Sequence, residues 1–67
     1  MAISRDTLGP QVVGGTYHCG YWLKDYEVLE ITPINAWDFE ITVRWLDDGR
    51  IVTHRTAWDY KRDRVIV

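Results

Sequence analysis

The sequence predicts an all-β fold, a small five-stranded antiparallel barrel, and three observations support this prediction. Residues 39–45 alternate apolar and polar side chains, the pattern breaks at Asp48-Gly49 and resumes with Ile51-Val52 and a Thr-rich run, and together these features are the strongest short-range signal of a β-hairpin. No segment has the length and the period of a stable helix. A chain of 67 residues has material for one core, and closing a sheet of short strands on itself removes its unpaired edges.

The N-terminal part of the chain predicts a flexible start and then a strand. Residues 1–10 lack periodicity, so we expect a flexible N-terminus followed by a single barrel domain over residues 11–67. Residues 11–19 predict the first strand. Gly14-Gly15 interrupts that strand, and a glycine pair in such a place indicates a bulge or a sharp bend.

The next apolar segment, residues 26–32, predicts the second strand. Successive side chains of a strand point to opposite faces, so we expect Leu29 and Ile31 on one face and Val28 and Glu30 on the other. Proline then ends the strand because it lacks the N–H that a sheet ladder needs.

The hairpin of residues 39–56 leaves two registers open. A two-residue loop at Asp48-Gly49 would place Trp45 opposite Val52, and a three-residue loop with a glycine bulge would place Trp45 opposite Ile51. In both registers the indole meets a branched aliphatic side chain. After the hairpin, the charged and aromatic residues 57–63 predict a short helical turn or an irregular corner, and residues 64–67 predict the last strand.

Charge and cysteine content limit the classes of function. The net charge is −2, but residues 1–43 carry two basic and six acidic side chains, whereas residues 44–67 carry six basic and four acidic ones. In an interleaved sheet this asymmetry predicts cross-strand charge pairs, and a basic ligand-binding face is the alternative. Cys19 is the single cysteine, which excludes an internal disulfide and favours a cytoplasmic location. No long apolar run predicts a signal peptide or a membrane span.

Nine aromatic side chains form the main functional clue. In so small a chain most of them must build the core. We expect four in the core, namely Phe39, Trp45, Tyr26 and Trp58. Four others lie in predicted connections, where large aromatic side chains are harder to bury, and they are the candidate partner-binding residues: Tyr21, Trp22, Trp37 and Tyr60.

Catalytic and metal-binding patterns are absent from the sequence. His18 and Cys19 are neighbours, but adjacent side chains of a strand point to opposite faces and do not act together. Asp47-Asp48 has the composition of a turn rather than of an acid–base pair, and no glycine-rich phosphate loop is present. We therefore expect no enzyme activity, no cofactor and no metal.

Two stretches of the chain resemble Tudor-type SH3-like barrels. Residues 20–31 read GYWLKDYEVLEI, an aromatic loop that leads into an apolar strand, and Val43, Trp45, Asp47 and Gly49 match the family's pattern of Val-x-aromatic-x-Asp-x-Gly. The resemblance covers roughly residues 17–56. It implies an SH3-like barrel, and it places Trp22 and Trp45 at positions of an aromatic cage that holds methylated lysine or arginine through cation–π attraction. Asp48 departs from the pattern, since the family usually has an aromatic residue there.

These observations predict a non-catalytic module that contacts a protein or a peptide through its loop aromatics. The alternative is a nucleic-acid-binding barrel in which arginines hold phosphates, and its candidate residues are Arg44, Arg55, Arg62 and Arg64. The sequence predicts neither the ligand nor the oligomeric state.

Overall fold

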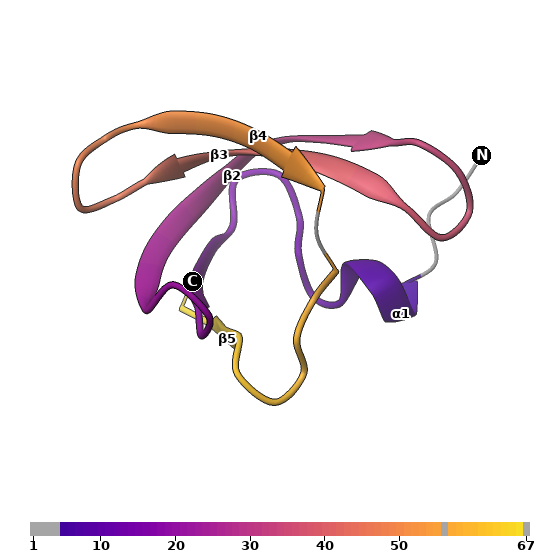
Figure 1. The fold of residues 1–67 in the computed structure, drawn as a ribbon, viewed down its shortest axis with the longest axis horizontal. Helices are drawn as coiled ribbons and strands as arrows, with labels where there is room; N and C mark the ends of the chain where they lie inside the picture. Colours follow the sequence, from indigo (N-terminus) through magenta and orange to yellow (C-terminus); the bar gives the residue numbers. More distant parts are fainter. Residues whose placement is uncertain (1–4, 56, 67) are drawn as a thin grey trace.

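The computed structural model describes residues 5–55 and 57–66, and it consists of one antiparallel sheet with a four-residue helix before it (Figure 1). The strand order across the sheet is β4-β3-β2-β1-β5, so the first four strands form a meander and the last strand returns to the edge beside the first. The all-β prediction is confirmed. The elements are α1 (Arg5–Leu8), β1 (Thr16–Cys19), β2 (Lys24–Pro33), β3 (Phe39–Trp45), β4 (Ile51–Arg55) and β5 (Arg64–Val65).

The prediction of a closed barrel is wrong, because the sheet is open. Among the described residues, β4 pairs with β3 alone, and β5 pairs with β1 through two residues, Val65 opposite Tyr17 and Arg64 opposite His18. Between β4 and β5 the chain leaves the sheet and forms the loop at the bottom of Figure 1. Within the described part of the chain β4 and β5 are not paired with each other, so the outer edge of β4 is free there.

The predicted helical turn before the last strand is not present. Residues 59–63 form a turn in which carboxylates satisfy the backbone. Asp59 Oδ1 accepts hydrogen bonds from the N–H groups of Lys61 at 2.9 Å and Arg62 at 3.2 Å, and Asp63 Oδ2 accepts one from the N–H of Asp59 at 2.9 Å. These bonds cap a single turn, closed by the N–H of Asp63 to the carbonyl of Asp59 at 2.8 Å, and the turn does not continue as a helix because the next residues, Arg64–Val65, form β5.

Both predicted registers of the β3–β4 hairpin are wrong. Val43 pairs with Val52 and Arg44 with Ile51, and the N–H of Trp45 bonds to the carbonyl of Arg50 at 2.9 Å. Residues 46–49 therefore form a four-residue loop that ends at Gly49, whose φ is +75°. The residue opposite Trp45 in the hairpin is thus Arg50 and not a branched aliphatic residue. On its β2 side Trp45 pairs with Tyr26, and the centroids of the two rings lie 5.7 Å apart.

The predicted faces of β2 are also wrong, because a β-bulge shifts the alternation. Val28 pairs with Val43, but the next pair joins Glu30 to Thr42. Leu29 is the extra residue and is exposed, whereas Val28 is fully buried. A bulge puts two residues of one strand opposite one of its partner. As a result, Val28 and Ile31 both face the core.

The core lies on the inner, concave face of the sheet. The four predicted core aromatics are all buried, and Tyr17, which the sequence did not single out, is buried as well. Trp58 packs edge-on against Tyr17 at 5.6 Å. Leu8 is buried in the same cluster, and the N–H of Trp58 bonds to the carbonyl of Thr7 at 2.9 Å, so the packed structure begins before residue 11. Residues 1–4 and 67 of the predicted terminal segments lie outside the described residues.

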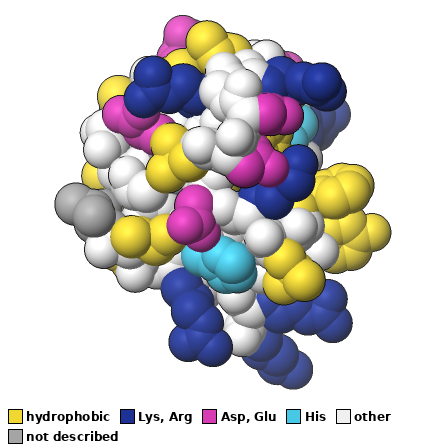
Figure 2. Space-filling view, turned by 90° about the vertical axis from the view of Figure 1, so that its left-hand side faces the viewer, with side chains coloured by type: hydrophobic (Ala, Val, Ile, Leu, Met, Phe, Trp, Pro, Cys, Tyr) yellow, Lys and Arg dark blue, Asp and Glu magenta, His cyan; other side chains and the backbone are white. Residues whose placement is uncertain are grey.

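The outer face of the sheet is polar, and opposite charges pair across it as predicted. Arg44 bonds to Glu27, and Arg55 lies 3.2 Å from Asp38. Figure 2 shows a different side of the molecule, the left-hand side of Figure 1, where acidic and basic side chains are interspersed and basic side chains gather at the lower edge.

Candidate functional site

The aromatic loop between β1 and β2, residues 20–23, is the most exposed apolar part of this end of the molecule. Tyr21 and Trp22 are 70% and 60% exposed, and their rings meet edge to face at 5.0 Å. Leu23, which is 75% exposed, has a φ of +58°, a conformation that costs a non-glycine residue roughly 1–2 kcal/mol. An exposed and strained apolar loop contributes nothing to the core, so it is a candidate binding element.

The aromatic loop is held in place by the turn at residues 59–63. The N–H of Gly20 donates to Asp63 Oδ1 at 2.9 Å. Gly20 also lies directly on the backbone of Arg62, where an added Cβ would approach the carbonyl oxygen to 2.4 Å. Asp63 thus joins the two segments, since its other oxygen accepts the N–H of Asp59. The loop is a fixed wall of the site.

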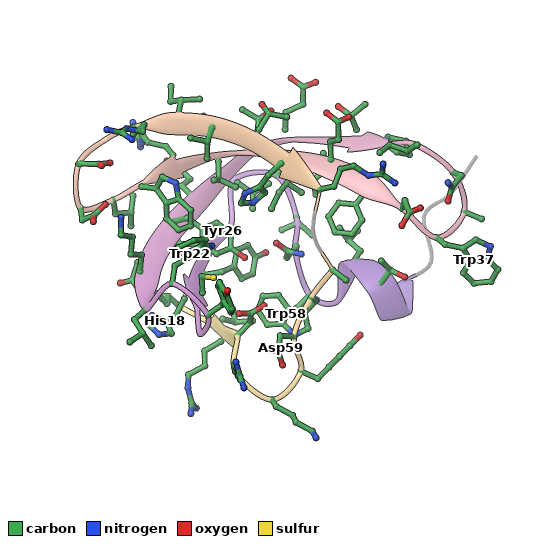
Figure 3. The ribbon with its side chains drawn as sticks, viewed as in Figure 1. His18, Trp22, Tyr26, Trp37, Trp58 and Asp59 are labelled. Carbon is green, nitrogen blue, oxygen red and sulfur yellow. The ribbon has the colours of Figure 1, made fainter. Side chains whose placement is uncertain are left out.

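A cleft of about 300 Å³ lies between the aromatic loop and β4, along the open side of the sheet. The inner face of the sheet and the N-terminal segment form its floor, and β4 with the residues that follow it forms the second wall. In Figure 3, Trp22 and Tyr26 lie on this inner side. The lining residues are Gln11, Cys19, Tyr21, Trp22, Tyr26, Ile41, Trp45, His54, Arg55, Ala57, Asp59 and Asp63.

Two indoles, a lysine and a histidine meet at the β4 side of this cleft. Trp22, Lys24, Trp45, Val52 and His54 line a second hollow of about 310 Å³ that shares Trp22, Trp45 and His54 with the first. The Nζ of Lys24 lies 5.6 Å from the centroid of the Trp45 ring, within cation–π range. The His54 ring lies 6.4 Å from the same indole, and burial lowers the pKa of His54. His54 is therefore mainly neutral at pH 7.

The floor of the cleft is fixed by buried hydrogen bonds. Tyr26 donates its hydroxyl to Gln11 Oε1 at 2.9 Å, and Gln11 Nε2 donates to the carbonyl of Leu8 at 3.0 Å. Gln11 is only 1% exposed. Burial, with a smaller contribution from Asp63, raises the pKa of Tyr26, so its hydroxyl stays protonated and donates. The sheet and the N-terminal segment are thereby joined under the cleft.

The four aromatic residues predicted to bind a partner are all exposed, but they do not form one patch. Tyr21 and Trp22 are together, and Tyr60 lies in the turn that supports them. Trp37 is 70% exposed in the loop between β2 and β3 and points away from Trp22 at the other end of the long axis (Figure 3). Its loop is fixed by Asn35, whose Oδ1 accepts the N–H of Trp37 at 2.8 Å.

The four arginines of the alternative prediction are distributed over different parts of the surface. Arg44 and Arg55 are paired with Glu27 and Asp38, as described above, and Arg62 lies 4.0 Å from Asp59. Arg62 and Arg64 come from the segment at the bottom of Figure 1, and the basic side chains of Figure 2 gather at the same end. Arg62 and Arg64 are thus close in the sequence, whereas Arg44 lies on β3 and Arg55 on β4.

The neighbours His18 and Cys19 lie on opposite faces of the sheet. His18 lies on the outer face with its Nδ1 2.8 Å from Asp25 Oδ1, whereas Cys19 lines the cleft on the inner face. Within residues 5–55 and 57–66, no three His, Cys, Asp or Glu side chains lie close enough together to hold a metal ion. In the same residues, no helix has the length and the apolar character needed to cross a membrane.

Comparisons with known proteins give no match. No family model matches the chain, and neither a curated protein nor a solved structure is significantly similar to it. The site must therefore be interpreted from its own geometry.

Sequence reasoning missed the residues that shape the cleft. Gln11 and Asp63 act through hydrogen bonds to distant parts of the chain, and no local pattern predicts those partners. Lys24 is the exception. It lies two residues before Tyr26 in β2, so both side chains are on the same face of the sheet, and Tyr26 pairs with Trp45 on the neighbouring strand.

Proposed function

We propose that this protein is a non-catalytic module that binds an extended segment of a partner protein at the open side of its sheet. One apolar side chain of that segment enters the cleft beside Trp22, and its backbone pairs with the free edge of β4. The observation that carries the proposal is the position of the aromatic cleft beside an edge strand that has no partner on its outer side among the described residues.

The ladder between β3 and β4 shows which backbone groups a peptide would meet. Because Trp45 and Arg50 form a hydrogen-bonded pair, the alternation of an antiparallel ladder turns the N–H and C=O groups of Ile51 and Thr53 toward the free edge. Peptides that add a strand to such an edge gain affinity from main-chain hydrogen bonds and specificity from side-chain pockets. The Tudor-type resemblance enters this proposal only through Trp22 and Trp45, its two cage positions, which line a common hollow; the family's preference for methylated lysine or arginine is not part of the proposal.

Selection of binders from a phage-displayed library of random linear peptides tests the proposal, with affinities measured by fluorescence anisotropy on a labelled selected peptide. Trp22→Ala should weaken binding at least about tenfold, as expected for a central aromatic contact. Trp37→Ala is the matched control, because it removes an equally exposed indole at the far end of the molecule. A selection without specific binders, or binders indifferent to Trp22→Ala, would refute the proposal.

The role of β4 has its own test. Proline is tolerated at the first residue of a strand, so Ile51→Pro removes an outward N–H and leaves the β3–β4 ladder in place. Ile51→Ala, which shortens the same side chain and keeps the N–H, is the control. Weaker binding of the proline variant alone supports strand addition, and equal binding of both variants contradicts it.

Nucleic-acid binding is the second candidate function, and the basic side chains gathered at one end of Figure 2 favour it. It predicts that single-stranded RNA or DNA binds at low salt, that affinity falls steeply with added salt, and that Arg62→Ala with Arg64→Ala weakens binding. Absence of binding in a low-salt filter or anisotropy assay would exclude it.

A further inference from the structure

Lys24 occupies the place where a cationic ligand of the cleft would be expected to bind. As the first residue of β2 it lines the second hollow, at the β4 side of the cleft, with its Nζ 5.6 Å from the centroid of Trp45. The negative face of an indole is the part of the ring that attracts cations. Asp47 Oδ2 lies 3.4 Å from the same ammonium group, and the two side chains are 40% and 51% exposed, so this ion pair is open to solvent and weak.

The acidic groups of the cleft are already used by the protein itself. Asp63 accepts the N–H of Gly20 with one oxygen and the N–H of Asp59 with the other. Asp59 accepts two N–H groups of its own turn and has the guanidinium of Arg62 4.0 Å away. These carboxylates are therefore poor partners for an incoming cation.

Two other basic side chains line the cleft, Arg55 and the mainly neutral His54, and both differ from Lys24 in their surroundings. Arg55 is engaged with Asp38 at 3.2 Å on the outer side. His54 faces the indole of Trp45 from β4. The ammonium group of Lys24 is thus the charge that a ligand entering beside Trp45 would approach.

We infer that Lys24 sets the specificity of the second hollow beside the cleft, which accepts a segment carrying a carboxylate next to its apolar anchor and rejects one carrying a lysine or arginine there. This inference rests on the proposed peptide-binding function and names the chemistry of the partner. The geometry is the reverse of a cation-binding cage, because the aromatic face is covered by the protein's own ammonium group. A ligand carboxylate would take a position that Asp47 now fills only in part.

Charge reversal at Lys24 tests the inference. The probe is a selected phage-library peptide, synthesised in two forms with Glu or Lys beside the apolar anchor, and titrated by anisotropy against each variant. The wild-type protein should prefer the Glu form roughly tenfold, because the exchange replaces an attraction by a repulsion at a partly exposed site. Lys24→Gln should abolish the preference, and Lys24→Glu should reverse it.

The matched control is Lys61→Glu, which makes the same change in net charge on an exposed lysine that lines neither the cleft nor the second hollow, whereas Lys24 lines the second hollow. It should leave the preference for the Glu form unchanged. Equal binding of both peptide forms by the wild type, a preference that survives Lys24→Glu, or an equal effect of Lys61→Glu would overturn the inference and leave peptide binding standing. Failure of both peptide forms to bind any variant would overturn the proposed function and this inference with it.

Discussion

Replacing Gly9 by alanine should be among the most damaging single changes in this protein. Gly9 joins α1 to the sheet with a φ of +64°, and an added Cβ would lie 2.4 Å from Cγ of Trp58. Trp58 is 8% exposed and belongs to the core cluster, so it has little freedom to move. The substitution therefore combines a backbone effect with a packing effect.

The two effects have separate magnitudes. A left-handed conformation costs a non-glycine residue roughly 1–2 kcal/mol. Inserting a methyl group into a filled core costs roughly 1–3 kcal/mol more, because side chains must leave their preferred rotamers. We expect Gly9→Ala to lower the free energy of unfolding by roughly 2–5 kcal/mol, a large share of the stability of so short a chain.

Gly14 offers a matched control for the backbone effect. Its φ is +89°, and a Cβ there would meet no atom within 4 Å. Gly14→Ala should therefore cost roughly the backbone amount alone, about 1–2 kcal/mol. Urea unfolding followed by tryptophan fluorescence measures both variants, and Gly9→Ala in a Trp58→Leu background isolates the packing part. The reasoning is refuted if Gly9→Ala costs no more than Gly14→Ala, since Trp58 would then not pack on the N-terminal segment.

Three further outcomes are expected. Tyr26→Phe should cost about 1–3 kcal/mol in urea unfolding, because it leaves Gln11 Oε1 buried without its donor, and the cost should shrink when Gln11→Met is also present; an additive double variant would contradict the buried bond. Asp63→Ala should speed hydrogen exchange at the Gly20 amide, whereas Asp48→Ala, which removes a carboxylate from a different turn, should not. Because burial lowers the pKa of His54, the unfolded chain takes up a proton near its ordinary pKa of 6.5 before the folded chain does. The stability linked to this group is thus complete above pH 6.5 and is lost as the pH falls through the lower, folded-state pKa. His54→Asn should lose less stability than the wild type between about pH 7.5 and about pH 5.5 in urea titrations, and equal losses would count against the buried ring.

Strand content was predictable from the sequence because alternation and β-branching are local signals, whereas register was not. The Asp48-Gly49 pair suits a two-residue loop and also the end of a longer one. The choice depends on carboxylates that bond the backbone: Asp48 Oδ1 accepts the N–H of Arg50 at 2.9 Å, and Asp47 Oδ1 accepts the N–H of Asp48 at 2.8 Å. Such bonds are optional for any aspartate in a turn, so the sequence alone leaves the loop length open.

The candidate site was predictable in part for the same reason. The exposure of Trp22 followed from its place in a connection, and the burial of Trp45 followed from its place in an alternating strand. Their meeting at one hollow depends on the path of the whole sheet, to which the bulge at Leu29 contributes. A bulge has no reliable signature in an apolar run, since Val28 and Leu29 are equally suited to the core by composition.

The open side of the sheet and the cleft have one physical origin. A sheet whose last strand has two residues does not close, so its inner face must be covered by something other than strands. Two segments outside the sheet do this, because Leu8 comes from α1 and Trp58 from the chain after β4. Trp58 packs edge-on against Tyr17, and neither Leu8 nor Trp58 lines the cleft between Trp22 and β4. The cleft is the part of the inner face that these two segments leave uncovered, and the aromatic loop forms its wall.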